Sequence, residues 1–321
     1  MTWRGVFLSD DQLRPIWRCL ISVVLIVLAV RLVGVARGLI FRALGGWPPV
    51  FVDFKWYSLL LFPALVVVFK FMTFVFDRRP LGSVGVAFHS RWRAELGTGL
   101  AVGAVMLLLV AAMEAALGLA HFGWSAESPG HILRGGASLG FLLLIAAANE
   151  ELVFRGYPFQ RLMDAIGPVG AIVVFSALFG LGHLANPEHT WISTLNTMLV
   201  GIPLAVAYLR TRALWMPIGI HLAWNFVLGY ALGLPVSGLD FSAKVLTPVV
   251  TGPQWVTGGA YGPEGGVLTT GVVLAATFYL LASRRIYISE EMKKMVLGPP
   301  RVHAAPPELV SLSLAGPGEE G

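Results

Sequence analysis

A cluster of charged residues follows one of the most hydrophobic stretches of the sequence. Glu150, Glu151 and Arg155 come directly after the apolar run at residues 141–148. Each ionisable group at membrane depth costs about 2.5–3.5 kcal/mol even on the insertion scale with the smallest penalties, so such groups rarely persist without a function. Residues four apart share a helix face, so Glu151 can pair with Arg155 and leave Glu150 without a local counter-ion. We predict that Glu150 is a general base; the alternative is a buried clamp of three charges with no catalytic use.

Two further apolar stretches carry polar groups at helical spacing. Phe179 and His183 share one helix face, and His221 and Asn225 share another. A polar group in lipid needs a partner, so these side chains and the acidic pair are expected to gather inside a helix bundle. Together they would form a hydrolytic site, because a carboxylate and an imidazole can activate water while an imidazole and an amide hold an oxyanion. The alternative for each histidine is a hydrogen-bonded core residue.

The composition indicates a protein that lies in a membrane. Hydrophobic residues make up 56% of the 321 residues and charged residues 13%, whereas soluble domains carry about 25% charged residues. The net charge of +5 does not point to nucleic acid, because the Lys and Arg residues lie between apolar blocks and not on one face. The single cysteine, Cys19, excludes an intrachain disulfide and a cysteine metal site.

The apolar blocks have the length of transmembrane helices, about 20 residues each. We therefore predict an all-α fold, a polytopic membrane bundle of about eight helices. The expected spans are residues 16–36, 57–76, 95–120, 136–160, 168–185, 190–209, 213–233 and 267–283. Basic residues cluster after the second, fourth, sixth and eighth spans, so both termini are expected in the cytoplasm. We divide the chain into a cytosolic lead-in at 1–15, a membrane domain at 16–285 and an amphipathic, disordered tail at 286–321.

Two local features complete these expectations. The Gly-rich segment 252–266 reads as a flexible outer loop. At about 1.5 Å of rise per residue, Glu150 would lie about 20 Å from the outer side and His183 about 24 Å from the inner side. Straight, parallel helices would then hold the proposed base and its imidazole apart. Convergence of the site requires either that the expected span boundaries are wrong or that these helices tilt, break or begin deeper.

The three motifs resemble those of a known family of intramembrane endopeptidases. This is the CAAX protease and bacteriocin-processing family, which includes the Ras-converting CAAX prenyl endopeptidase. The resemblance covers roughly residues 138–230, with the protease motifs in order on three apolar spans. The matching positions are Glu150-Glu151-x-x-x-Arg155, Phe179-x-x-x-His183 and His221-x-x-x-Asn225. Each motif alone is weak, but the three in this order are specific.

The resemblance implies an endopeptidase of a prokaryotic plasma membrane, with membrane lipid around it. Glu150 with His183 would activate the attacking water, while His221 and Asn225 would stabilise the tetrahedral intermediate. The supporting positions would be Glu151, Arg155 and Phe179. The substrate would be a peptide or protein, either prenylated and CAAX-like or bacteriocin-like. We expect no nucleic acid partner.

Three alternatives remain beside metal-free glutamate catalysis. The first is a zinc-dependent protease in which Glu150, His183 and His221 would be the metal ligands. The sequence contains no His-Glu-x-x-His motif, so we expect no metal and no other cofactor. The second is a transport protein, because intramembrane Glu and His residues also serve ion paths. The third is a non-catalytic immunity or scaffold protein with the same fold.

Overall fold

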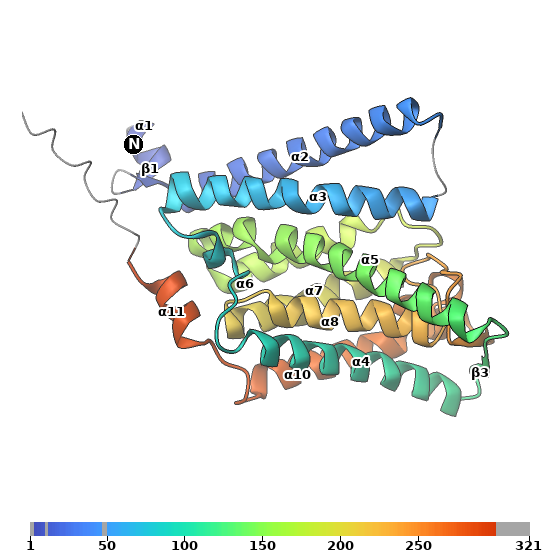
Figure 1. Cartoon of the computed structure of the whole chain (residues 1–321). Coiled ribbons are helices and arrows are strands. Elements are labelled where there is room, and N and C mark those ends of the chain that lie inside the picture. Colours follow the sequence, from blue (N-terminus) through green and yellow to red (C-terminus); the bar gives the residue numbers. More distant parts are fainter. Residues whose placement is uncertain (1–2, 10–11, 47–49, 300–321) are drawn as a thin grey trace, which may run out of the picture.

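A computed structural model describes residues 3–9, 12–46 and 50–299 as a helical bundle (Figure 1). Its long helices are α2 (Pro15–Ala43), α3 (Val50–Met72), α4 (Trp92–Ala116), α5 (Pro129–Arg155), α6 (Tyr157–Gly182), α7 (Trp191–Thr211), α8 (Trp215–Phe226) and α10 (Val267–Ala282). Among the described residues, five runs are long and apolar enough to cross a membrane: Pro15–Ala43, Phe54–Asp77, Trp92–Ala116, Pro129–Gly182 and Trp191–Thr211. The predicted all-α polytopic bundle is confirmed.

Each predicted span overlaps one of these helices, but some boundaries differ. The fourth span was expected to reach residue 160, whereas α5 ends at Arg155 and α6 begins at Tyr157. Gly156, with ψ −141°, breaks the helix there. Pro158 then lies in the first turn of α6, where its missing N–H leaves no helical hydrogen bond unmade. The acidic cluster therefore lies in the last two turns of α5, and not in the middle of a span.

Two of the long helices continue in a wider π-helical turn. The segment η1 (Thr73–Asp77) follows α3, and η3 (Val227–Ala231) follows α8. A short 3₁₀ segment, η2 (Leu81–Val84), precedes α4. With η3 included, the seventh span reaches residue 231, close to its predicted end.

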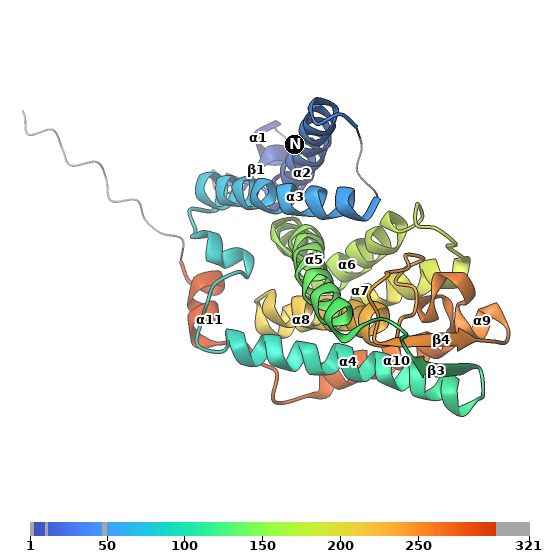
Figure 2. The same cartoon turned by 45° about the vertical axis from the view of Figure 1, so that its right-hand side comes forward.

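Helix α8 lies inside the bundle, where it contacts α4, α5 and α7 (Figures 1 and 2). Its contact with α4 is made by backbone, because a Cβ on Gly99 would come 2.3 Å from the carbonyl oxygen of Met216. A Cβ on Gly103 would come 2.2 Å from the carbonyl oxygen of Ile220. Small residues four apart let two membrane helices approach this closely. The α4 glycines thus set the position of α8.

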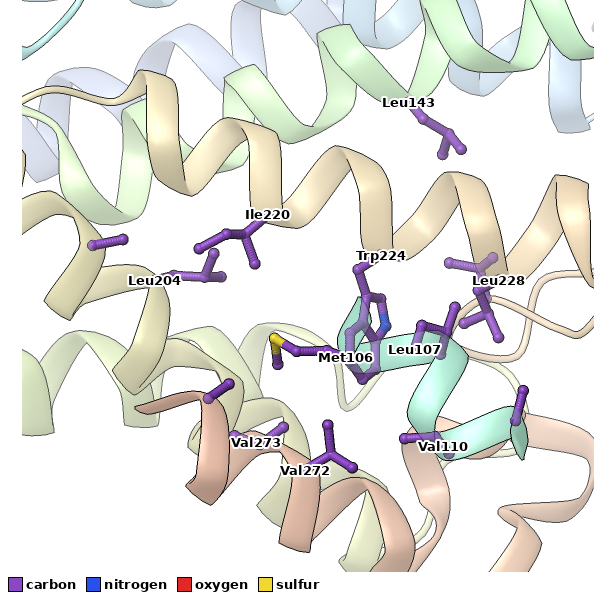
Figure 3. Close-up of a cluster of buried hydrophobic side chains, with 14 of the residues drawn as sticks. Met106, Leu107, Val110, Leu143, Leu204, Ile220, Trp224, Leu228, Val272 and Val273 are labelled. Carbon is purple, nitrogen blue, oxygen red and sulfur yellow. The ribbon is translucent and has the colours of Figure 1, made fainter. Parts of the chain in front are cut away.

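A hydrophobic cluster fills the space between α4, α5, α7, α8 and α10 (Figure 3). Trp224 extends from α8 toward Met106 and Leu107 of α4, and Val272 and Val273 come from α10. Trp224 and Met106 are each 4% exposed, and Leu107 is fully buried. Burial of a large apolar side chain contributes roughly 1.5–3 kcal/mol relative to exposure in water. This apolar cluster packs against α8, next to its polar face.

We call the end of the bundle that carries α1 (Trp3–Phe7) and α11 (Glu290–Leu297) the terminal end. The elements at this end include α1 and two short strands, β1 (Leu8–Ser9) and β2 (Gln12–Leu13), which pair antiparallel. Asp77 joins three elements there, accepting from Arg18 Nη1 at 2.9 Å and Tyr157 Oη at 3.1 Å. Helix α11 (Glu290–Leu297) covers part of the segment predicted to be amphipathic, and Arg79 donates to the carbonyl oxygen of Met295 at 2.6 Å. The disordered tail was predicted at 299–321, and residues 300–321 lie outside the described residues.

We call the opposite end, which carries β3, β4 and residues 252–266, the loop end. Strands β3 (Ala120–Trp124) and β4 (Leu246–Val250) pair antiparallel there, with Ala120 opposite Val250. Next come α9 (Gln254–Thr257) and two 3₁₀ turns, η4 (Gly259–Tyr261) and η5 (Pro263–Gly265). These short elements connect β4 to α10 and lie over one end of the bundle (Figure 2).

The loop end differs from the flexible loop expected from composition. Tyr261 is 1% exposed, and its carbonyl oxygen accepts from the N–H of Gly238 at 2.9 Å. Gly262, at φ +98°, packs so closely that a Cβ would lie 2.2 Å from the carbonyl oxygen of Pro235. Glycine is here a requirement for a tight turn and close backbone contact, and not a sign of mobility.

The close α4–α8 contact yields a stability prediction. Gly103→Ala places a methyl group against the backbone of Ile220, so we expect a loss of about 1–3 kcal/mol and a lower thermal midpoint in detergent. Gly97→Ala is the matched control on the same helix, since nothing lies within 4 Å of a Cβ there. Alanine is the better helix former, so this control should be neutral or slightly more stable. Equal midpoints for the two variants would contradict the close packing.

Candidate active site

The charged end of α5 is buried and held from two sides. Glu151 is fully buried and Arg155 is 1% exposed. Arg155 Nη1 donates to Glu151 Oε1 at 3.1 Å, which is the pair expected from their spacing. Arg155 Nη2 donates to the carbonyl oxygen of Gly201 in α7 at 3.1 Å. The guanidinium thus balances one carboxylate and fastens α5 to α7.

His221 of α8 shares the same carboxylate oxygen. Its Nδ1 lies 2.9 Å from Glu151 Oε1. An ionised carboxylate only accepts hydrogen bonds, so Nδ1 carries the proton and donates. The imidazole is thereby oriented with Nε2 toward Glu150, 3.8 Å from its Oε2. Sequence spacing did not indicate the contact between Glu151 and His221, because it joins two different helices.

His183 approaches Glu150 from α6. It caps the C-terminus of this helix, and its Nδ1 donates to the carbonyl oxygen of Phe179 at 2.7 Å. Its Nε2 lies 4.0 Å from Glu150 Oε2. Both imidazoles therefore have Nδ1 engaged and Nε2 directed at one carboxylate oxygen. That oxygen is buried and makes no hydrogen bond to the described residues.

Glu150 and His183 are not held apart as straight, parallel helices would hold them, because α6 is broken. Gly167 has φ +84° and ψ 164°, so residues 157–166 and 168–182 are two helices joined at a kink. Pro168 follows and cannot donate the hydrogen bond that would continue the first one. Residues 168–182, the membrane-spanning part of α6, therefore do not continue in the direction of residues 157–166. The kink lets the end of α6 reach the depth of Glu150.

Phe179 lies at the centre of the charged groups. Its ring centroid is 4.8 Å from that of His183 and 6.1 Å from that of His221, the latter edge-to-face. The guanidinium carbon of Arg155 lies 4.7 Å from the same ring centroid. A ring in this position restricts both imidazoles to few rotamers and stabilises the buried cation.

The predicted residues line one cavity of about 360 Å³. Glu150, His183, His221 and Asn225 all contribute to its wall, and the Glu150 side chain is 35% exposed. Asn225 lies one helical turn after His221, so the amide and the imidazole share a face of α8. The structure thus brings the four predicted site residues together, with Glu151 and Arg155 behind them.

The donor set does not have the arrangement of a zinc site. A tetrahedral site with bonds of 2.0–2.1 Å places its ligand atoms about 3.3 Å apart. Glu150 Oε2 is 4.0 Å from Nε2 of His183 and 3.8 Å from Nε2 of His221. Among the residues that the structure describes, no group of three His, Cys, Asp or Glu side chains could hold a metal ion. We therefore derive no catalytic step through a metal.

Two cavity residues were not recognised as site candidates from the sequence. Glu264 of the loop end and Ser237, which follows η3, line the same cavity as Trp224. Asn196 of α7 donates to the carbonyl oxygen of Glu264 at 2.9 Å. The available signal was an acidic residue amid glycines, which composition assigned to a flexible loop.

Comparison with known proteins finds a family match in the region of the chain that carries the site. Residues 135–227 match the family model described as Type II CAAX prenyl endopeptidase Rce1-like. No curated protein and no solved structure matches the chain. The match runs from α5 to the end of α8 and contains every predicted site residue. The helices that carry the site are therefore the part of the chain that is similar to the Rce1-like CAAX endopeptidases.

Proposed function

We propose that this protein is an intramembrane endopeptidase that hydrolyses a peptide bond with a water activated by Glu150 and His183. The observation that carries the proposal is the meeting of one unpaired carboxylate oxygen with two imidazole Nε2 atoms, at 3.8 and 4.0 Å, in one cavity. These separations are too long for direct hydrogen bonds, and they leave room for a bridging water. The family match supports peptide hydrolysis as the reaction class.

Each group takes one role in this mechanism. Glu150 accepts a proton from the water as its oxygen attacks the substrate carbonyl carbon, and it returns that proton to the leaving amine. His183 Nε2 holds the water, since Phe179 occupies its Nδ1 proton. His221 and Asn225 donate hydrogen bonds to the oxyanion of the tetrahedral intermediate.

Glu151 supports His221 without touching substrate. Its carboxylate accepts from His221 Nδ1, and so supports an imidazole that carries a second proton on Nε2. That second proton is the donor required at the oxyanion. Arg155 pairs with the same carboxylate at 3.1 Å, so the fully buried Glu151 has a counter-ion. The acidic pair is thus divided into one reacting carboxylate and one structural carboxylate.

We further propose that the substrate is a membrane-associated peptide or protein, prenylated and CAAX-like or bacteriocin-like. The cavity lies among helices of membrane-spanning length, so its substrate must present an extended bond at or within the lipid. The proposed location is a prokaryotic plasma membrane with both termini in the cytoplasm. The transport and scaffold alternatives need neither a water-activating carboxylate nor an oxyanion donor.

The assignment of the base predicts a catalytic loss without a structural one. Glu150→Gln keeps the shape of the side chain but removes its basic oxygen, so peptide cleavage should fall by about 10²–10⁴-fold. Mass spectrometry of peptides incubated with purified protein in liposomes measures the loss. Glu188→Gln, at an exposed position, should retain parental cleavage. Cleavage by Glu150→Gln at the parental rate would refute this role.

The two glutamates should differ in their effect on stability. Glu151→Gln leaves Arg155 buried without its ion pair, so we expect a loss of about 3–5 kcal/mol. Glu150→Gln removes a charge that has no ion-pair partner within hydrogen-bonding distance, so its thermal midpoint should equal or exceed that of the parent. Thermal unfolding of both variants in the same detergent compares them. The opposite order of midpoints would contradict the division of roles.

Metal-free catalysis predicts resistance to chelators. Cleavage by the purified protein should continue at an unchanged rate after dialysis against a strong zinc chelator, because no step passes through a metal. The readout is peptide cleavage before and after dialysis, with zinc added back in a third sample. Activity that is lost on dialysis and restored by zinc would establish the metalloprotease alternative.

A further inference from the structure

The carboxylate of Glu264 connects the loop end of the bundle to the cavity. The residue lies in η5, and it lines the same cavity as Glu150. Its Oε1 accepts from the indole N–H of Trp224 at 2.8 Å. Its Oε2 accepts from the backbone N–H of Ser237 at 2.5 Å and from the Ser237 hydroxyl at 2.8 Å. One side chain therefore fastens the loop to α8 and to the turn that follows it.

Ser237 is held in an unfavourable backbone conformation. Its φ of +48° lies in the left-handed region, which residues other than glycine rarely adopt. Such conformations are unfavourable and persist only where the surroundings impose them. The two hydrogen bonds to Glu264 supply that constraint, together with the backbone pairing of Val236 and Leu239. Strain of this kind concentrates at functional sites.

Trp224 links this carboxylate to the catalytic face of α8. It follows His221 by three residues and precedes Asn225, and its ring packs on Met106 in the core (Figure 3). The indole N–H is the only polar group of the side chain, and a buried one needs an acceptor. Glu264 is that acceptor, so it fixes how α8 is rotated about its own axis. The same rotation sets where the imidazole and the amide point.

The loop is also fastened to α7. Asn196 Nδ2 donates to the carbonyl oxygen of Glu264 at 2.9 Å and to that of Gly266 at 2.8 Å. Its Oδ1 accepts from the hydroxyl of Thr270 at 2.6 Å. Glu264 therefore lies where α7, α8 and the loop end meet, across the cavity from the terminal end.

We infer that Glu264 is a positioning residue of the hydrolytic site, an inference that rests on the proposed function. Through Trp224 it fixes the α8 turn that presents His221 and Asn225 to the substrate carbonyl. Through Ser237 it holds the loop across the cavity, so that water and substrate do not enter from the loop end. Glu264 itself touches no reacting atom.

The kinetic test separates positioning from a general structural effect. In Glu264→Gln the amide cannot accept both Trp224 and Ser237 hydrogen bonds as the carboxylate does, so kcat should fall on the order of tenfold. KM should change little, because the oxyanion contacts form in the transition state. Trp224→Phe should lower kcat similarly, and the double variant should be no worse than either single one. Glu127→Gln is the matched control, an exposed glutamate at the same end of the bundle.

A labelling test measures closure of the cavity without any substrate. A cysteine at Asn186→Cys, in a chain with Cys19→Ala, reports access because Asn186 lines the cavity. The protein is reconstituted into liposomes in both orientations, so that some molecules have their loop end outside. A membrane-impermeant maleimide added outside should label this cysteine slowly from the loop end. Adding Glu264→Gln should raise that rate on the order of tenfold, because it weakens the contacts that close the cavity. Glu127→Gln should leave the rate unchanged.

The outcomes are separable. Parental kcat together with unchanged labelling in Glu264→Gln overturns the inference. If that variant unfolds, as its thermal midpoint would show, Ser237→Ala removes one of the three hydrogen bonds and gives the same comparison with a smaller effect. A parent protein that cleaves no peptide overturns the proposed function instead. The labelling rates then still decide whether Glu264 closes the cavity.

Discussion

The site depends on one buried carboxylate oxygen that accepts hydrogen bonds from two side chains at once. Glu151 Oε1 accepts from Arg155 Nη1 at 3.1 Å and from His221 Nδ1 at 2.9 Å. A charge in lipid is tolerated only with partners, so this oxygen ties α5 to α8, and the guanidinium adds α7 through Gly201. With Glu151 neutralised in this way, the neighbouring Glu150 is the carboxylate left facing the cavity.

These contacts require helices that approach more closely than large side chains would allow. The α4 glycines bring α8 to backbone contact, and a Cβ on Gly201 of α7 would lie 2.8 Å from Ser176 of α6. A Cβ on Gly180 would likewise lie 2.9 Å from the carbonyl oxygen of Thr194. Packing in lipid gains no hydrophobic free energy from helix contact, so close approach and polar contacts must hold the bundle. The polar site is thus part of what assembles the fold.

Helical periodicity made the local part of this structure predictable from sequence. It predicted the side chains that share a face, such as Glu151 with Arg155, and the length of the apolar blocks predicted spans that each overlap a helix. Contacts between helices have no such signal, and His221 reaches Glu151 across 70 residues of sequence. The pair Gly167-Pro168 marks a break in α6, but not the direction that the chain takes after it. Glu264 was missed because composition describes a loop's average tendency, whereas its specific contacts decide whether it is ordered.

A closed loop end has a direct electrostatic consequence for hydrolysis within a membrane. The interaction between a developing oxyanion and its donors is stronger at low dielectric, and it weakens when bulk water can screen it. A cavity open at both ends would be continuous with solvent and would lose that advantage. With the loop end closed by Glu264, Glu150 and the imidazoles can order the water that reaches them. The polar lining and the sealed end therefore serve the same requirement, a small supply of water in an otherwise apolar surrounding.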